Sequence, residues 1–371
     1  MTLAGQRVKV LIVDDSAFMR KVLHSLLASD PQIEVAGEAR DGREAIALNE
    51  SLRPDVISMD IMMPHVDGLQ ATEQIMGTNP RPIVIVSSEA KEGADATLRA
   101  LELGAIDFVP KPSNGIDLDM TSVRDDLCRK LKMAARVRVV RNARNIAPAR
   151  PVQFQSESLL KAQRPAAGSN GNGMRHPLVV MAASTGGPQT LMQLVPAIPR
   201  DFLGSLILVQ HMPGTFTTQF SRQLAEVASV HVKEAQAGEE LQPGTMYVCP
   251  GSHHLRISRT GRIELEEGER INGYRPCADV TMESAAQYAG PMCVGVVLTG
   301  MGGDGGRGVR AVKAAGGHVI AQDESTSVIF GMPAEAIKTG AVDEVLGVDA
   351  IPQALAKRAM FLMGAAKVGA M

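Results

Sequence analysis

The sequence predicts two α/β domains joined by a flexible linker, with a doubly wound parallel sheet in the first and a mostly parallel sheet in the second. Short β-rich apolar runs alternate with amphipathic stretches over residues 7–130 and again over residues 176–365. Parallel strands need crossover connections, and this alternation supplies them. Between the two, over residues 131–175, the alternation stops. A chain of 371 residues is long enough for two such domains.

The first domain is predicted to consist of five βα units. The expected strands are Val8–Val13, Ile33–Ala36, Val56–Met59, Ile83–Ser87 and Asp107–Val109. The expected helices, which show apolar residues at three- and four-residue spacing, include Ala17–Ala28, Gly42–Leu52, Leu69–Met76 and Glu92–Leu103.

The linker differs from both domains in charge. Residues 1–126 carry 12 Lys and Arg against 21 Asp and Glu, a net charge of −9, and residues 177–371 carry 15 against 18, a net charge of −3. Residues 127–176 carry 11 against 1, a net charge of +10, and end in a stretch rich in Gly, Ser and Asn. A basic joint followed by such a stretch is typical of a flexible tether.

The second domain resumes the alternation. The expected strands are Leu178–Ala183, Leu206–Gln210, Met246–Val248, Leu255–Ser258, Val294–Leu298 and His318–Ala321, with a hairpin over residues 246–267. The expected helices are Pro188–Val195, Phe216–Ala228, Val280–Tyr288, Gly308–Ala315 and Pro352–Met363. Asp279 precedes one of these helices and is expected to cap it.

Composition argues against several protein classes. The four cysteines are scattered without CxxC or His pairing, which indicates a reducing cytoplasm and neither disulfides nor structural zinc. No apolar run reaches the ~18 residues of a membrane span, so membrane insertion is not expected. The basic linker has no interleaved aromatic residues, and no nucleic-acid-binding motif is visible, so we expect no nucleic-acid partner. A monomer is expected.

Polar side chains stand where strands of the first domain should end. Asp14 and Asp15 follow the first strand and Asp60 follows the third. Ligands of open α/β sheets bind beyond these strand ends, and converging carboxylates suit a hard cation such as Mg²⁺. Ser87 and Lys111 follow the fourth and fifth strands and could bind phosphoryl oxygens, with Asp60 as the nucleophile toward a phosphodonor.

Four motifs containing these residues resemble the response-regulator receiver family. They are Val-Asp-Asp-Ser at 13–16, Met-Asp-Ile-Met-Met-Pro-His-Val-Asp-Gly at 59–68, Val-Ser-Ser at 86–88 and Phe-Val-Pro-Lys-Pro at 108–112. The resemblance implies a flavodoxin-like (βα)5 fold and phosphorylation of Asp60 by a CheA-type histidine kinase. It further implies Mg²⁺ bound by Asp14, Asp15, Asp60 and the backbone carbonyl of Met62, with Ser87 and Lys111 on the phosphoryl group.

Three segments of the second domain each place one chemically versatile residue at a strand end. Ser184 stands before Gly186 at a tight strand-to-helix turn, His211 follows the next strand, and Asp304 lies among glycines after a later strand. Separately, the serine turn and the glycine loop could bind phosphate, and the histidine could be a packed residue. Together they could act as nucleophile, base and orienting carboxylate. The order Ser-His-Asp disfavours an α/β-hydrolase, whose order is Ser-Asp-His.

These segments, with Phe-Gly-Met-Pro at 330–333, resemble the CheB-type methylesterase family over about residues 176–365. The resemblance implies a Rossmann-like sheet and an acyl-enzyme mechanism without a cofactor, with Ser184, His211 and Asp304 as the catalytic residues and an oxyanion hole from the backbone of Met301 and Thr185. The implied substrates are glutamate methyl esters, and specific glutamines, on methyl-accepting chemotaxis receptors. Two alternatives remain open: service in a non-swimming receptor pathway, and a non-enzymatic receiver-output protein.

Overall fold

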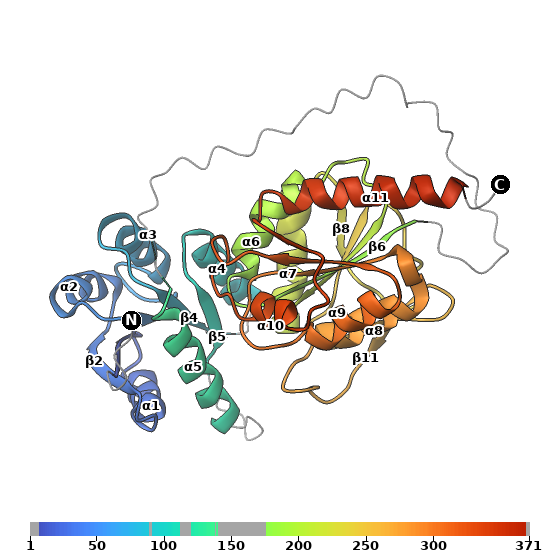
Figure 1. Cartoon of the computed structure of the whole chain (residues 1–371). Coiled ribbons are helices and arrows are strands. Elements are labelled where there is room, and N and C mark those ends of the chain that lie inside the picture. Colours follow the sequence, from blue (N-terminus) through green and yellow to red (C-terminus); the bar gives the residue numbers. More distant parts are fainter. Residues whose placement is uncertain (1–6, 89–90, 112–119, 138, 140–175, 369–371) are drawn as a thin grey trace.

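The computed structural model describes residues 7–88, 91–111, 120–137, 139 and 176–368. They form two α/β units that lie side by side (Figure 1), an N-terminal unit over residues 7–139 and a C-terminal unit over residues 176–368. Most of the predicted linker, residues 140–175, lies outside the described residues.

The N-terminal unit alternates strands and helices as predicted. Its elements are β1 (Val8–Val13), α1 (Ala17–Ala28), β2 (Ile33–Ala39), α2 (Gly42–Leu52), β3 (Val56–Met59), α3 (Gly68–Thr78), β4 (Ile83–Ser87), α4 (Lys91–Glu102), β5 (Asp107–Pro110) and α5 (Met120–Ala134). The sheet is parallel with the order β2-β1-β3-β4-β5, the flavodoxin-like order. The order reverses between β1 and β3, so the residues after these two strands meet at the switch point.

Side-chain caps fix where the first helices of this unit begin. Ser16 accepts a hydrogen bond from the Met19 N–H at the start of α1 (3.3 Å). Asp41 does the same for α2 and Asp67 for α3, at 2.9 and 2.8 Å. Each cap satisfies an N–H that the helix itself leaves without a partner. The three loops at the carboxyl edge of the sheet are therefore held in place by their own sequence.

The C-terminal unit contains a larger sheet. Its elements are β6 (Leu178–Ala183), α6 (Gly187–Leu194), the 3₁₀ turn η1 (Val195–Ala197), β7 (Ser205–Gln210), α7 (Gly214–Val227), β8 (His231–Glu234), β9 (Thr245–Val248), β10 (His254–Ile257), β11 (Ile263–Glu266), α8 (Ala278–Ala289), η2 (Gly290–Met292), β12 (Cys293–Val297), α9 (Gly306–Ala314), β13 (His318–Gln322), α10 (Met332–Lys338), β14 (Glu344–Leu346) and α11 (Ile351–Val368).

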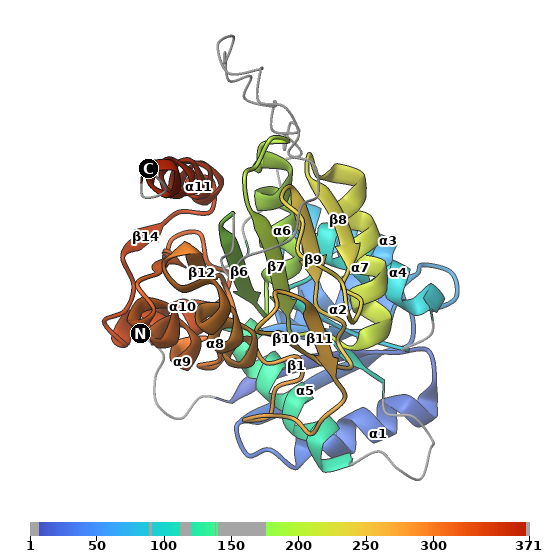
Figure 2. The same ribbon diagram turned by 90° about the vertical axis from the view of Figure 1, so that its right-hand side faces the viewer.

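The seven strands of this sheet run parallel in the order β14-β13-β12-β6-β7-β9-β8. Helices cover both faces (Figure 2), which explains why central strands are apolar throughout. Val179 and Met181 of β6 pack into the cluster that contains α6 and α7, whereas Val180 and Ala182 pack into the cluster that contains α8 and α9.

The predicted hairpin over residues 246–267 is wrong in its first half. β9 pairs in parallel with β7 and β8 in the large sheet, and only β10 and β11 form an antiparallel pair. β9 is buried along its whole length, which is typical of a strand inside a covered sheet. The sequence pattern also misses β8 and β14, because each is a short edge strand with few buried residues.

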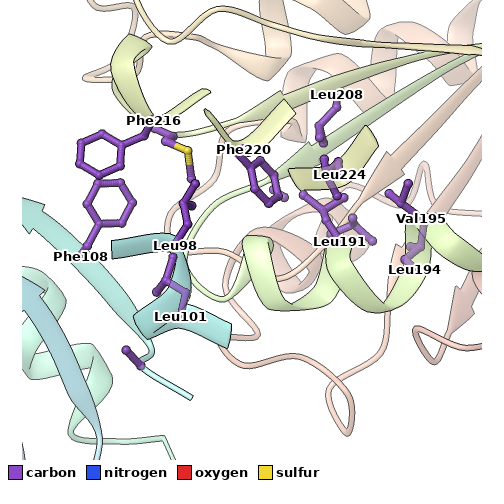
Figure 3. Packing of buried hydrophobic residues seen from close by; sticks show 14 of the residues in the cluster. Leu98, Leu101, Phe108, Leu191, Leu194, Val195, Leu208, Phe216, Phe220 and Leu224 are labelled. Atoms are coloured by element: carbon purple, nitrogen blue, oxygen red, sulfur yellow. The ribbon is translucent and has the colours of Figure 1, made fainter. Parts of the chain in front are cut away.

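The two units share an apolar contact. Phe108 of β5 packs on Phe216 of α7 with ring centroids 4.3 Å apart, and Leu98 and Leu101 of α4 belong to the same buried cluster (Figure 3). Polar bonds flank it: the side-chain amide of Gln189 donates to the carbonyls of Leu101 and Ala105 at 2.7 and 2.9 Å. The N-terminal unit thus packs on α6 and α7 of the C-terminal unit, close to the turn that carries Ser184.

Candidate active site

The candidate active site lies at the carboxyl edge of the large sheet, where the strand order reverses. β6 lies between β7 and β12, so later strands extend the sheet on both sides of it. Ser184 follows β6, His211 follows β7, and Asp304 lies in the loop after β12. Open α/β sheets bind their ligands at such switch points.

The backbone around Ser184 is fixed by neighbouring loops. The Ser184 N–H donates to the Thr299 carbonyl (3.0 Å), and the Ser184 carbonyl accepts from the side-chain amide of Gln210 (2.9 Å). Gly186 has a φ of 76°, which a residue with a Cβ rarely adopts, and α6 begins directly after it. Ser184 therefore stands just before a helix N-terminus, which favours developing negative charge.

His211 and Asp304 form the closest polar contact of the site. The imidazole Nε2 and the Asp304 Oδ2 are 2.7 Å apart, and both side chains are largely buried. Burial alone would raise the pKa of Asp304, but the hydrogen bond and charge of His211, with the N–H groups of Ala278 and Asp279, lower it to about 2. Asp304 is therefore ionised at neutral pH and can orient the imidazole.

The other imidazole nitrogen is available for chemistry. Nδ1 of His211 is buried and has no hydrogen-bond partner among the residues that the structure describes. The His211 N–H donates to the Ala183 carbonyl (3.0 Å), which ties His211 to the residue before Ser184. Within the described ranges, no hydrogen bond joins the Ser184 hydroxyl to the imidazole. Because Asp304 occupies Nε2, Nδ1 is the nitrogen left to accept a hydroxyl proton.

Asp304 also caps a helix. Its carboxylate accepts from the N–H groups of Ala278 (2.6 Å) and Asp279 (3.0 Å) at the start of α8, and from the Cys277 thiol (3.2 Å). Burial and the nearby carboxylates raise the pKa of this thiol to about 12, so it keeps its proton.

The prediction that Asp279 caps its own helix is wrong. Asp304, arriving from another loop, fills that position, and the Asp279 side chain accepts instead from the Gly308 N–H in α9 (2.8 Å). A carboxylate from the loop before α9 thus caps the start of α8, and a carboxylate of α8 caps the start of α9.

Tyr274 is a site residue that the sequence reasoning missed. Its ring stacks on the His211 imidazole with centroids 4.6 Å apart and an interplanar angle of 22°. Asn272-Gly273 before it is a recognisable tight-turn signal. That signal predicts the turn, but nothing local in the sequence indicates which residue the tyrosine will contact.

The acidic cluster of the N-terminal unit forms as predicted. Carboxylate oxygens of Asp14, Asp15 and Asp60 lie within 4.8 Å of one another, and Lys111 Nζ lies 2.8 Å from both Asp14 and Asp60. Burial raises the pKa of Asp60 and outweighs the lowering effect of Lys111. Burial alone would lower the pKa of Lys111, but Asp14 and Asp60 raise it. Three clustered carboxylates are a donor set that fits Mg²⁺.

Ser87 and Met62, the other two residues predicted for this site, lie near the acidic cluster, but the Ser87 hydroxyl makes no described hydrogen bond to its carboxylates. The Ser87 hydroxyl is buried and bonds weakly to the Gly93 carbonyl (3.4 Å), not to Asp60. The Asp60 carboxylate accepts from the N–H groups of Ile61 (2.7 Å) and Met62 (3.4 Å), so the backbone of Met62 adjoins it. The Met62 side chain is exposed.

Both predicted oxyanion residues border the N-terminal unit. The Thr185 hydroxyl donates to the Asp107 carboxylate, whose other oxygen lies 3.2 Å from Lys130 Nζ. Met301 lines a cavity of about 330 Å³ together with residues of α5, among them Arg129. The N-terminal unit therefore touches the residue next to Ser184 directly.

Comparison with known proteins identifies both units. A response regulator receiver domain model matches residues 10–121, and a CheB methylesterase model matches residues 179–355. A protein-glutamate methylesterase/protein-glutamine glutaminase from Pyrococcus horikoshii is 45% identical over 100% of this chain and 98% of its own. This chain belongs to that methylesterase/glutaminase family.

Other members of the methylesterase/glutaminase family agree. One from Symbiobacterium thermophilum is 44% identical over 94% of this chain and 96% of its own. The crystal structure of the Thermotoga maritima CheB methylesterase catalytic domain is 40% identical, with a TM-score of 0.48, over 49% of this chain and 98% of that one. The predicted family is confirmed by the methylesterase/glutaminase relatives, and the predicted α/β fold class is confirmed by the parallel sheets and helices of this chain.

Two general properties accompany this assignment. The N-terminal unit is a receiver domain, a domain type whose phosphorylation generally depends on Mg²⁺. Across the described parts of the chain, no helix combines the length and the apolar character needed to cross a membrane.

Proposed function

We propose that this chain hydrolyses glutamate methyl esters on methyl-accepting chemotaxis receptors and deamidates receptor glutamines, under the control of its receiver domain. The relatives bear both activities in their names. The observation that carries the proposal is the 2.7 Å contact between His211 and Asp304 at the switch point beside Ser184. An ionised carboxylate that orients an imidazole next to a serine is the arrangement of serine hydrolases.

In the proposed reaction, Ser184 is the nucleophile. Its Oγ attacks the γ-carbonyl carbon of the ester while the hydroxyl proton passes to Nδ1 of His211. The imidazolium returns the proton to the departing methoxide, and methanol leaves. Water then repeats the sequence on the glutamyl-enzyme and releases glutamate. With a glutamine substrate, ammonia leaves in place of methanol.

The negative charge that develops on the carbonyl oxygen needs donors. The backbone N–H groups of Met301 and Thr185 are proposed for this role. Thr185 follows Ser184 in the chain, and Met301 follows Gly300, where a Cβ would lie 2.8 Å from the Cβ of Ser184. The N-terminus of α6 adds a favourable dipole. In this proposal the esterase step uses no cofactor.

In the receiver unit, Asp60 is proposed to accept a phosphoryl group from a CheA-type histidine kinase. Asp14, Asp15, Asp60 and the backbone carbonyl of Met62 would hold Mg²⁺. When bound, the ion would supply positive charge against the phosphoryl oxygens. Lys111 already pairs with Asp60, and Ser87 lies at the end of the adjacent strand, so both are proposed to contact the phosphoryl group.

Regulation is proposed to act through the contact between the units. In the unphosphorylated state the receiver packs on α6 and α7 and binds Thr185, next to the nucleophile. Phosphorylation would weaken this packing and shift the equilibrium toward an open form. Removal of residues 1–140 would give the upper limit of activity.

Gln189→Ala is expected to raise methanol release by the unphosphorylated protein. The change removes two hydrogen bonds between the units, each worth about 1 kcal/mol, so the open form should gain roughly five- to thirtyfold. Gln193→Ala is the matched control, since Gln193 on the same helix bonds Asp349 within the C-terminal unit. An equal rise in both variants, or in neither, contradicts the proposed regulation.

The proposed nucleophile is tested by labelling. A fluorophosphonate reacts with a serine only where a base activates it. The full-length protein should form one adduct, and mass spectrometry should map it to the peptide that contains Ser184. Activation with acetyl phosphate and Mg²⁺ should speed the labelling. Absence of label from an active protein, or a label on another serine, would overturn the assignment.

A further inference from the structure

The ring of Tyr274 covers one face of the His211 imidazole. We propose that Tyr274 is a positioning residue: it holds the imidazole of His211 in its reactive orientation and stabilises the imidazolium that forms during the reaction. This inference rests on the proposed function, because it assumes that His211 is the base. It begins from the stacked geometry, with 4.6 Å between the ring centroids and 22° between the planes.

The chain delivers Tyr274 to this position by a tight turn. Ile271 and Tyr274 exchange both of their backbone hydrogen bonds at 3.0 Å, and the two residues between them have positive φ angles, 53° at Asn272 and 85° at Gly273. This is the conformation that Asn-Gly favours. Arg275 then donates to the Gly268 carbonyl (2.7 Å) and closes the loop on itself. The hydrogen bonds of this loop therefore fix the backbone position from which the Tyr274 ring projects.

The phenol end of Tyr274 fills the space above the glycine loop. A Cβ at Gly302 would lie 1.9 Å from the Tyr274 oxygen, so the loop can pass beneath the phenol only because residue 302 has no side chain. Gly302 also has a φ of 92°, which disfavours other residues. Tyr274 thus contacts both the imidazole and the loop that carries Met301.

The aromatic ring of Tyr274 can stabilise the His211 imidazolium, a cation that forms only during the reaction. The face of an aromatic ring carries partial negative charge and attracts cations more strongly than neutral groups. Burial raises the pKa of the Tyr274 phenol, so the ring presents a neutral phenol at working pH. His211 becomes an imidazolium when it takes the Ser184 proton. Because this attraction grows toward the transition state, its loss should lower kcat and leave KM nearly unchanged.

The test measures methanol release from a methylated receptor fragment by full-length variants, activated with acetyl phosphate and Mg²⁺. Tyr274→Leu should lower kcat about tenfold, with KM within about twofold of the original, as expected for loss of an aromatic and cation–ring contact. Tyr274→Phe, which keeps the ring, should restore kcat to within about twofold. Tyr274→Met provides a second non-aromatic side chain, in case leucine prevents folding.

Tyr288→Leu is the matched control. Tyr288 is also half-buried in the C-terminal unit, and its phenol oxygen also lies over a glycine with positive φ, Gly261. It has no described contact with His211, so kcat should not change. An unchanged kcat in both non-aromatic variants would overturn the proposal, as would an equal loss in Tyr274→Phe. Two further arms separate the hypotheses: no methanol release by the original protein refutes the proposed function, and methanol release that survives in Ser184→Ala refutes Ser184 as nucleophile with His211 as its base. Loss of methanol release in Ser184→Ala beside an unaffected Tyr274→Leu refutes only the role of Tyr274.

Discussion

Replacing Ser184 with alanine is expected to lower methanol release from a methylated receptor by about 10⁴-fold or more, leaving only the residual rate that oxyanion donors and substrate binding supply. The hydroxyl is the only group that this change removes. The N–H and carbonyl of residue 184, which bond Thr299 and Gln210, remain. The fold, and phosphorylation of the receiver, should therefore be unaffected, and kinetic assays beside a phosphorylation assay would show the two outcomes together.

The control for this change is Ser229→Ala. Ser229 is an exposed serine of the same unit, whose hydroxyl makes one long contact with the Pro196 carbonyl (3.5 Å). Its replacement should leave methanol release unchanged. Substantial methanol release by the Ser184 variant would show that another group attacks the ester.

The second large effect is expected for Asp304→Asn. The ionised Asp304 carboxylate accepts a hydrogen bond from the Nε2–H of His211, and this bond fixes the tautomer of the imidazole. A neutral asparagine amide cannot fix the tautomer in the same way, and the imidazolium would lose its counter-ion. By analogy with the equivalent change in a serine protease, kcat should fall by about 10⁴-fold. Asp279→Asn is the matched control, because Asp279 belongs to the same buried cluster but does not contact His211. It should lower stability and spare kcat.

Asp304→Asn should also change how stability depends on pH. A carboxyl whose pKa is lowered from 3.8 to about 2 on folding stabilises the folded state above pH 4, and this stabilisation is lost as the pH falls toward 2. For Asp304 the contribution is about 2 kcal/mol. In urea unfolding, the difference between the original protein and the variant should narrow from pH 6 to pH 3. A constant difference would mean that folding does not lower the pKa of Asp304.

The sequence predicts the rim of each sheet well because the relevant residues stand next to strand ends. Asp60, Ser184 and His211 each follow a recognisable apolar run, and strand ends of one parallel sheet share an edge. The core strands β6, β7 and β12 are predicted for the same reason. The local sequence pattern is enough to predict a site residue wherever that residue directly follows a strand, because the strand fixes its position in space.

Contacts between distant segments could not be predicted in this way. The stacking of Tyr274 on His211 and the exchange of caps between Asp304 and Asp279 depend on how two loops meet, which no local pattern encodes. The bond from Thr185 to Asp107 joins two separate units. The short edge strands β8 and β14 carry too few buried residues to produce a periodic signal.

The exchange of carboxylates between α8 and α9 has a consequence for biosynthesis. Because the Asp304 carboxylate, just before α9, caps α8 and the Asp279 carboxylate of α8 caps α9, the two helices should form in a single cooperative step. Until that step is complete, Ser184 has no oriented base beside it. A nascent or partly unfolded chain would therefore not hydrolyse esters. A newly synthesised molecule would become active only when its tertiary structure is complete.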